Sequence, residues 1–186
     1  GSTYKLSGEY IVEDGATLNI EAGVKIISIY DDIVDYILVK QGGKINAVGT
    51  SSAPIVMTSE KEEPGAWGGI HICGKAHTNA EGGKGSSEIG GATYGGNDDA
   101  DNSGTLKYVR VEYSGYAFDS EHEANGITFY GVGNGTTVEY CQAYKGSDDG
   151  FEFFGGSVNV SNLVSVSCSD DSFDLSLIHI SEPTRH

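Results

Sequence analysis

Hydrophobic and polar residues alternate in short runs along most of this chain, and the runs end at Gly, Asn, Asp or Ser. This two-residue period predicts β-strands, because successive side chains of a strand point to opposite faces. Few stretches show the three- and four-residue apolar spacing of a helix. The predicted strands are 10–12, 17–20, 24–29, 36–39, 44–47, 55–58, 69–73, 106–113, 127–130, 138–143, 151–154, 158–160 and 163–166.

Internal repeats indicate how these strands are arranged. Residues 138–151 align with residues 160–173 at an offset of 22 without a gap, and residues 106–111 fit the same register at an offset of 32. We assign the ten extra residues to a polar loop around 114–124. A unit of this length with two or three strands predicts one coil of a parallel β-helix, whose coils stack at about 4.8 Å. The expected interior ladders are Val109–Cys141–Leu163, Leu106–Val138–Val160, Ile127–Phe151–Phe173 and Phe129–Phe153.

Several segments resemble secreted or surface right-handed β-helix proteins of Bacteroidetes-like bacteria, namely 15–23, 65–70, 104–113 and 148–156. The resemblance covers about residues 8–174. It implies a right-handed solenoid and an extracellular or cell-surface location, and it implies no established activity. We therefore expect an all-β, single-domain parallel β-helix over 1–174, with an insertion loop at 77–103 and a truncated C-terminal end.

The last twelve residues, 175–186, differ in composition from the rest and resemble the translation of a transposon-end adapter used in sequencing libraries. We expect a non-native tail here and infer no function from its His and Glu residues. Its apolar residues Leu175, Leu177 and Ile180 could still cover the open edge of the last coil. Such an edge is a template for pairing with another chain, so self-association is expected there.

The charge composition of the chain limits the classes of molecule that it is expected to bind. The chain has 27 acidic and 11 basic residues, which gives a formal net charge of −16. This acidity argues against nucleic acid and anionic membranes, because both require a basic face. No apolar run approaches the roughly 20 residues of a membrane-spanning helix, no signal peptide opens the chain, and three Cys cannot form a full disulfide framework. Cations and neutral or basic ligands remain as the expected binding partners.

An acidic constellation is the strongest candidate site. At the offset of 22, the stacked pairs are Asp148–Asp170, Asp149–Asp171 and Glu152–Asp174, and Asn125 precedes Asp149 in its ladder. Each pair repels by roughly 1 kcal/mol in a water-like dielectric. Three interpretations stay open. The carboxyls form a solvated corner, or Asp149 and Asp171 bind Ca²⁺, or Asp148, Asp149, Asp170 and Asp171 supply a catalytic pair at the roughly 6.5–9.5 Å of an inverting glycosidase.

A second candidate for calcium is the turn that contains Asp99, Asp101 and Ser103, with Gly104 following. These residues match the first half of a calcium-binding loop, in which oxygen ligands occupy alternate positions. The twelfth position is Arg110 instead of Glu, so the segment is not an EF-hand. A polar turn without a metal is the alternative.

Aromatic residues could bind a ligand beside the loops 77–103 and 114–124, which we expect to wall a cleft along the solenoid. The candidates for stacking on sugar rings are Tyr94, Tyr113, Tyr116, Phe118 and Tyr144. The alternative is that these rings pack the loops onto the coils. His71 and Cys73 share one face of a strand, where we expect an outward His beside a half-buried Cys rather than a catalytic dyad.

Three functions follow from these features. The first is a secreted or surface scaffold that binds a glycan or a matrix component and is stabilised by Ca²⁺. The second is a fragment of a polysaccharide lyase or glycoside hydrolase, and the third is a structural adhesin stalk. An enzyme needs the acidic ladder inside a walled groove with basic residues nearby, whereas a stalk needs no groove.

Overall fold

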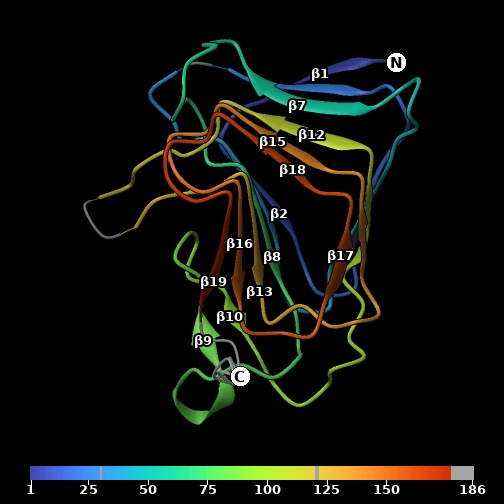
Figure 1. Ribbon diagram of the computed structural model, residues 1–186, viewed down its shortest axis with the longest axis vertical. Coiled ribbons are helices and arrows are strands. Elements are labelled where there is room, and N and C mark those ends of the chain that lie inside the picture. Colours follow the sequence, from blue (N-terminus) through green and yellow to red (C-terminus); the bar gives the residue numbers. More distant parts are fainter. Residues whose placement is uncertain (30, 120–121, 177–186) are drawn as a thin grey trace, which may run out of the picture.

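The computed structural model describes residues 1–29, 31–119 and 122–176, and three parallel sheets wind around one interior in it (Figure 1). Sheet A consists of β1 (Thr3–Leu6), β4 (Lys25–Ser28), β7 (Ile55–Ser59), β12 (Val109–Glu112), β15 (Gln142–Tyr144) and β18 (Val164–Val166). Sheet B consists of β2 (Glu9–Val12), β5 (Tyr36–Val39), β8 (Ile70–Cys73), β13 (Ile127–Tyr130), β16 (Phe151–Phe154) and β19 (Phe173–Ser176). Sheet C consists of β3 (Thr17–Ile20), β6 (Lys44–Val48), β11 (Gly104–Lys107), β14 (Thr137–Glu139) and β17 (Asn159–Ser161).

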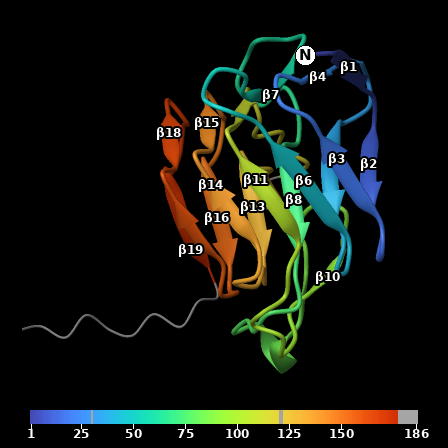
Figure 2. The same ribbon diagram turned by 90° about the vertical axis from the view of Figure 1, so that its right-hand side faces the viewer.

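The chain passes through sheets A, B and C in turn, so each circuit is one coil and hydrogen bonds run between coils. Figure 2 shows the coils following one another from the N-terminal to the C-terminal end. This is a right-handed parallel β-helix, and the predicted all-β solenoid is confirmed. The described residues contain no helix that is long and apolar enough to cross a membrane.

Interior ladders hold the coils together, as the repeat predicted. Leu106 pairs with Val138 and then Val160, and Ile127 pairs with Phe151 and then Phe173. The rings of Phe151 and Phe173 stack with their centroids 5.5 Å apart. Phe151 is fully buried, whereas Phe173 on the last coil is 47% exposed. The apolar column is therefore continuous and ends in an open edge.

Two predicted strands, 106–113 and 138–143, are each divided in the structure. Tyr108 and Tyr140 adopt the left-handed conformation with φ of 50° and 54°, and Asn162 does so at the same corner of the next coil. One such residue turns the chain from sheet C into sheet A. The alternation pattern gave no sign of this turn, because Tyr is not a typical turn residue.

The ten extra residues of the longer repeat are also distributed differently than expected. Eight of them lie between β12 and β13, in the loop around 114–124, and two lie between β13 and β14. The strands of sheet B therefore repeat at an offset of 24 between β13 and β16, and at 22 between β16 and β19. The described residues of this loop, 114–119 and 122–124, project from the corner between sheets A and B (Figure 1).

The insertion loop 77–103 contains a short 3₁₀ turn (Glu81–Gly83) and a two-stranded antiparallel ribbon of β9 (Gly85–Ser86) and β10 (Thr93–Tyr94). It folds over the outer face of sheet B and builds a second apolar cluster there. The cluster consists of Tyr36, Leu38, Cys73, Ile89, Ala92, Tyr94, Ala124 and Tyr130. The loop therefore packs onto part of the outer face of sheet B, through apolar contacts.

At the C-terminal end, β19 continues through Leu175 to Ser176, so the first two residues of the predicted tail pair with β16. Leu175 is 52% exposed. The remaining tail residues, including Leu177 and Ile180, lie outside the described residues.

Candidate functional site: a carboxylate cluster on the outer face of sheet B

Five carboxylic acids gather where the chain turns from sheet A into sheet B. We call this group the acidic cluster, and its members are Asp148, Asp149, Glu152, Asp170 and Asp174. Within it, one carboxylate oxygen from each of Asp149, Glu152 and Asp174 lies within 4.8 Å of the other two. The same holds for Asp148, Asp149 and Asp170. Asp149 belongs to both triplets and is therefore the centre of the cluster.

A ladder of hydrogen bonds fixes Asp149 from the coils on both sides. Its amide N–H donates to Asn125 Oδ1 of the preceding coil at 3.2 Å. Its own Oδ1 accepts the amide N–H of Asp171 in the following coil at 2.8 Å. In the predicted ladder of Asn125, Asp149 and Asp171, the side chains of Asn125 and Asp149 each accept a hydrogen bond from the backbone of the next coil. The exposed Asp171 contributes its N–H here, and its carboxyl belongs to neither triplet.

Glu152 lies on the outward-facing side of β16, because its neighbours Phe151 and Phe153 point into the core. Asn125 Nδ2 donates a hydrogen bond to Glu152 Oε2 at 2.5 Å, and Glu152 also shares a hydrogen bond with Asp174. Only 7% of Glu152 is exposed. A carboxyl so placed is protected from water on most sides.

Burial and mutual repulsion raise the pKa values of the central acids. Burial, and then the charge of Glu88, raises the pKa of Glu152 to about 9. Burial and the neighbouring Asp149 charge raise the pKa of Asp148 to about 7. Burial raises the pKa of Asp149 to about 6, against the lowering effect of the Asp171 N–H. Near neutral pH the cluster therefore combines protonated and ionised carboxyls in one place.

Two loops approach the cluster from the side. The insertion loop brings Glu88, whose pKa is raised by burial and by the charges of Asp149 and Asp174. The loop 114–124 brings His122, whose charge lowers the pKa of Glu88, and Glu123, whose charge raises that of Asp148. Both loops therefore lie close enough for their charges to act on the cluster, and the cleft that the sequence led us to expect stays a prediction.

The structure brings three of the four predicted catalytic acids close together. One carboxylate oxygen from each of Asp148, Asp149 and Asp170 lies within 4.8 Å of the other two, whereas the carboxyl of Asp171 belongs to neither triplet. The inverting pair about 6.5–9.5 Å apart that the sequence suggested for diagonal neighbours stays a prediction.

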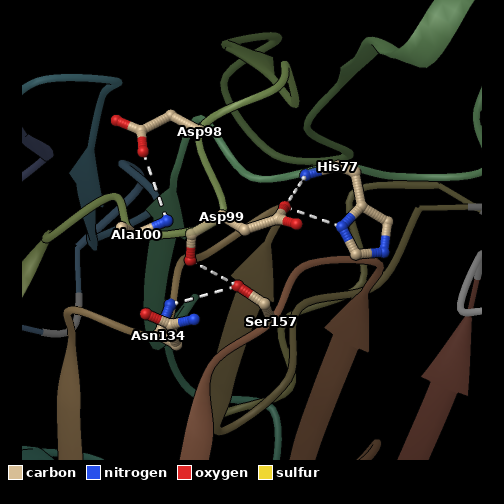
Figure 3. A network of polar contacts seen from close by, with 6 residues as sticks. All are labelled: His77, Asp98, Asp99, Ala100, Asn134 and Ser157. Atoms are coloured by element: carbon tan, nitrogen blue, oxygen red, sulfur yellow. Dashed lines mark hydrogen bonds and ion pairs between the residues drawn. The ribbon is translucent and has the colours of Figure 1, made fainter.

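The turn with Asp99, Asp101 and Ser103 uses its oxygens to tie the insertion to the coils. Asp99 Oδ1 accepts hydrogen bonds from His77, at 3.1 Å from N and 2.7 Å from Nδ1, and its carbonyl oxygen accepts from Ser157 (Figure 3). Asp101 Oδ2 accepts from the amide of Lys75 at 3.0 Å, and Ser103 is 1% exposed. This pattern favours the polar turn over a calcium loop.

The five aromatic candidates lie in three different places. Tyr94 is 3% exposed and packs against Tyr130, with ring centroids 5.2 Å apart, so its ring is not available to a sugar. Tyr116 and Phe118 form an edge-to-face pair in the loop 114–124, with Phe118 40% exposed. Tyr113 and Tyr144 are half-buried neighbours at the end of sheet A, with centroids 6.0 Å apart.

His71 lies on the outer face of β8 but is not exposed to solvent as we expected. Both His71 and Cys73 are fully buried, because the insertion loop covers the outer face of β8. Burial lowers the pKa of His71 to about 4, and Nε2 lies 2.7 Å from the carbonyl oxygen of Gly68. Burial raises the pKa of the Cys73 thiol to about 12, so the dyad is not a nucleophile.

Glu88 is the member of the site that sequence reasoning missed. It lies in the irregular loop 77–103, outside any repeat, so no offset linked it to the acids of β16 and β19. Glu152 and Asp174, by contrast, were detectable from their offset of 22. A separate cavity of about 830 Å³ opens at the N-terminal end of the coils, between Tyr4, Ile20 and Ile37. It is the uncapped end of the core and lies away from the cluster.

The family of the chain follows from the comparison with family models. The model for the pectate-lyase-like β-helix domain matches residues 1–177, which is nearly the whole chain. No curated protein and no solved structure matched. Members of this family are typically extracellular. The stacked sheets, the interior ladders and this match agree, and the chain belongs to the pectate-lyase-like β-helix domain family.

Proposed function

We propose that this domain binds polysaccharide on the outer face of its C-terminal coils, with Ca²⁺ held by the acidic cluster. The observation that supports the proposal is the convergence of Asp149, Glu152 and Asp174 within 4.8 Å, beside two loops. The family supports a polysaccharide as the class of ligand. Secretion or display on a cell surface, as a scaffold, belongs to the same proposal.

The donors suit calcium. Ca²⁺ takes about six to eight oxygen ligands in flexible geometry, and all five members of the cluster offer carboxylate oxygens. Among the described residues, the charged groups that shift the pKa values of Asp148, Asp149 and Glu152 are other carboxyls. A divalent cation would relieve that repulsion and replace the protons retained near neutral pH.

In this proposal, Asp149, Glu152 and Asp174 would hold the ion, and Asn125 would keep Glu152 in place through its hydrogen bond. Bound calcium would supply a positive charge that attracts sugar oxygens. Glu88 and His122 would line the side of the same site.

Calorimetry tests the proposal directly. Calcium chloride titrated into the protein at pH 8 should bind, and a polysaccharide should then bind more tightly in calcium than in EDTA. Asp149→Asn keeps an oxygen for the Asp171 amide but removes the central charge, so both effects should weaken at least tenfold. Glu21→Gln, an exposed residue of the N-terminal coils, is the matched control. Equal calcium binding by the protein and Asp149→Asn would contradict the proposal.

A second candidate is glycoside hydrolysis, which the separation of pKa values favours. With a pKa of about 9, Glu152 keeps its proton at neutral pH and could protonate a leaving group, whereas Asp149 is largely ionised. The test is the release of reducing ends from bound polysaccharides by the protein and by Glu152→Gln. Binding without release would exclude this candidate and leave the binding function.

A further inference from the structure

We infer that the outer face of sheet A binds an anionic glycan through a stripe of tyrosines and cations on two adjacent coils. The stripe consists of Lys107, Arg110, Tyr113, Tyr140, Tyr144 and Lys145. This inference rests on the proposed polysaccharide ligand, and it adds the charge of that ligand and a second place of contact.

The stripe follows β12 and β15, which lie next to each other in sheet A (Figure 1). The inward side chains of these strands, such as Val111 and Ala143, are buried in the core, so Arg110 and Tyr144 point outward. Lys107 is the last residue of β11 in sheet C, next to the corner that precedes β12, and Tyr140 lies at the same corner of the next coil. Tyr113 and Lys145 lie at the corner that follows the two strands.

The cations are held against the aromatic rings. The guanidinium carbon of Arg110 lies 4.4 Å from the centroid of the Tyr144 ring. Lys145 Nζ lies 5.2 Å from the same ring and 5.9 Å from that of Tyr113. Lys107 Nζ lies 5.8 Å from the ring of Tyr140, which stacks on Tyr108 at 4.7 Å. Contacts of this kind restrict long side chains before a ligand arrives and so reduce the entropy lost on binding.

Two of the three cations keep binding capacity, because Lys107 Nζ already forms an ion pair with Glu139 Oε2 at 2.9 Å. Arg110 pairs with Glu112 through Nε at 2.5 Å. Within the described part of the chain, no hydrogen bond engages its terminal Nη groups, which form the planar fork that suits carboxylates and sulfates. No carboxylate of the described residues lies within ion-pair distance of Lys145 Nζ. Three of the 11 basic residues of a chain with net charge −16 therefore lie on two adjacent coils, at the end of β11, in β12 and directly after β15.

Neighbouring coils show that the fold itself does not require these residues. The corner occupied by Tyr108 and Tyr140 is occupied by Asn162 in the last coil, and the corner of Tyr113 and Lys145 is occupied by Ser167. All six residues are left-handed, with φ between 50° and 61°. Asn adopts this conformation more readily than Tyr or Lys. In the outward column, Arg110 and Gln142 are flanked by Val56 and Val164.

The geometry therefore assigns the stripe to recognition instead of stability. Its tyrosines supply apolar surface to a sugar ring, and its cations supply partners for a carboxylate or sulfate group. Adjacent coils are about 4.8 Å apart, so contacts from both coils reach one extended chain.

The test measures binding of polygalacturonate, dextran sulfate and neutral dextran in EDTA at moderate salt, which removes any contribution from calcium. We expect the anionic polymers to bind and dextran not to bind. Tighter binding of polygalacturonate would identify a carboxylate as the preferred group of the ligand, and tighter binding of dextran sulfate would identify a sulfate. Lys145→Ser combined with Arg110→Gln should weaken that binding at least tenfold, because the two changes remove the cations with free donors. Both new residues occur at the equivalent position of the next coil, where Ser167 follows Lys145 and Gln142 follows Arg110. Lys44→Gln, an exposed cation on sheet C, should change it less than twofold.

Melting temperatures of the variants establish that they are folded, and Tyr140→Asn provides a second variant that tests the aromatic part. Dextran binding as well as the anionic polymers, equal binding by the stripe variants and Lys44→Gln, or equal binding of a DNA duplex would each overturn the inference. If no polymer binds in EDTA but one binds in calcium, the stripe is refuted and the calcium proposal stands. Loss of binding to every polymer under both conditions would refute both.

Discussion

Replacing Glu152 with Gln should make the protein more stable at neutral pH, although the side chain is nearly buried and hydrogen-bonded. Gln has the shape of a protonated Glu. Its carbonyl oxygen can accept the hydrogen bond from Asn125 Nδ2, and its amide can donate to Asp174. The substitution therefore keeps the local contacts and removes only the titration.

The size of the effect follows from the pKa of about 9 in the folded protein against 4.5 for an ordinary Glu. Between these values the folded state retains a proton that the unfolded state releases, so stability falls as pH rises, by at most about 1.4 kcal/mol per pH unit. From pH 5 to pH 7 the variant should gain at most about 2.7 kcal/mol relative to the parent. For a domain of this size that gain is about 5–10 °C in melting temperature.

Urea unfolding at pH 5, 7 and 8 in EDTA measures this difference, and the buried Trp67 provides a fluorescence signal. Glu21→Gln removes the same charge from an exposed position and should show a difference that does not grow with pH. A difference between Glu152→Gln and the parent that is constant with pH, or that falls as pH rises, would refute the account of a protonated, desolvated carboxyl.

Three further predictions concern the core, the metal and the open edge. Phe151→Ala should lower the free energy of unfolding by about 3–5 kcal/mol, and Phe173→Ala by clearly less because that ring is 47% exposed; equal urea midpoints would contradict the ladder. Millimolar calcium should raise the melting temperature over EDTA and over matched sodium chloride, and Asp149→Asn should abolish the rise; a rise of equal size in that variant would place the ion elsewhere. Leu175→Lys should reduce self-association in light scattering, because a charge protects the exposed edge of β19; unchanged scattering would mean that this edge does not mediate self-association.

The fold could be predicted because each coil of a solenoid places equivalent residues in the same environment. An offset of 22 places Phe151 on Phe173 and Glu152 on Asp174, and both pairs are in register in the structure. Stacking of like residues at a constant spacing leaves this direct signal in the sequence. The corners were harder, because left-handed Tyr108 and Tyr140 continue the strand-like alternation while they turn the chain.

The candidate site was only half predictable, for a physical reason. Its acids in β16 and its neighbouring turn belong to the repeat, but Glu88 arrives from an insertion whose path depends on apolar contacts such as those of Ile89 and Tyr94 with the outer face of sheet B. No periodicity encodes that packing. For the same reason Tyr94 resembled an exposed loop aromatic in the sequence, whereas it fills the second apolar cluster.

The central claim is that the acidic cluster binds a divalent cation, and crystallography at long wavelength tests it most directly. Crystals grown in calcium chloride at pH 8 should give an anomalous difference peak within coordination distance of Asp149, Glu152 and Asp174. A map with no peak between these carboxyls, with Glu152 still bonded to Asn125 and Asp174, would contradict the claim and identify the cluster as a protonated corner of the β-helix.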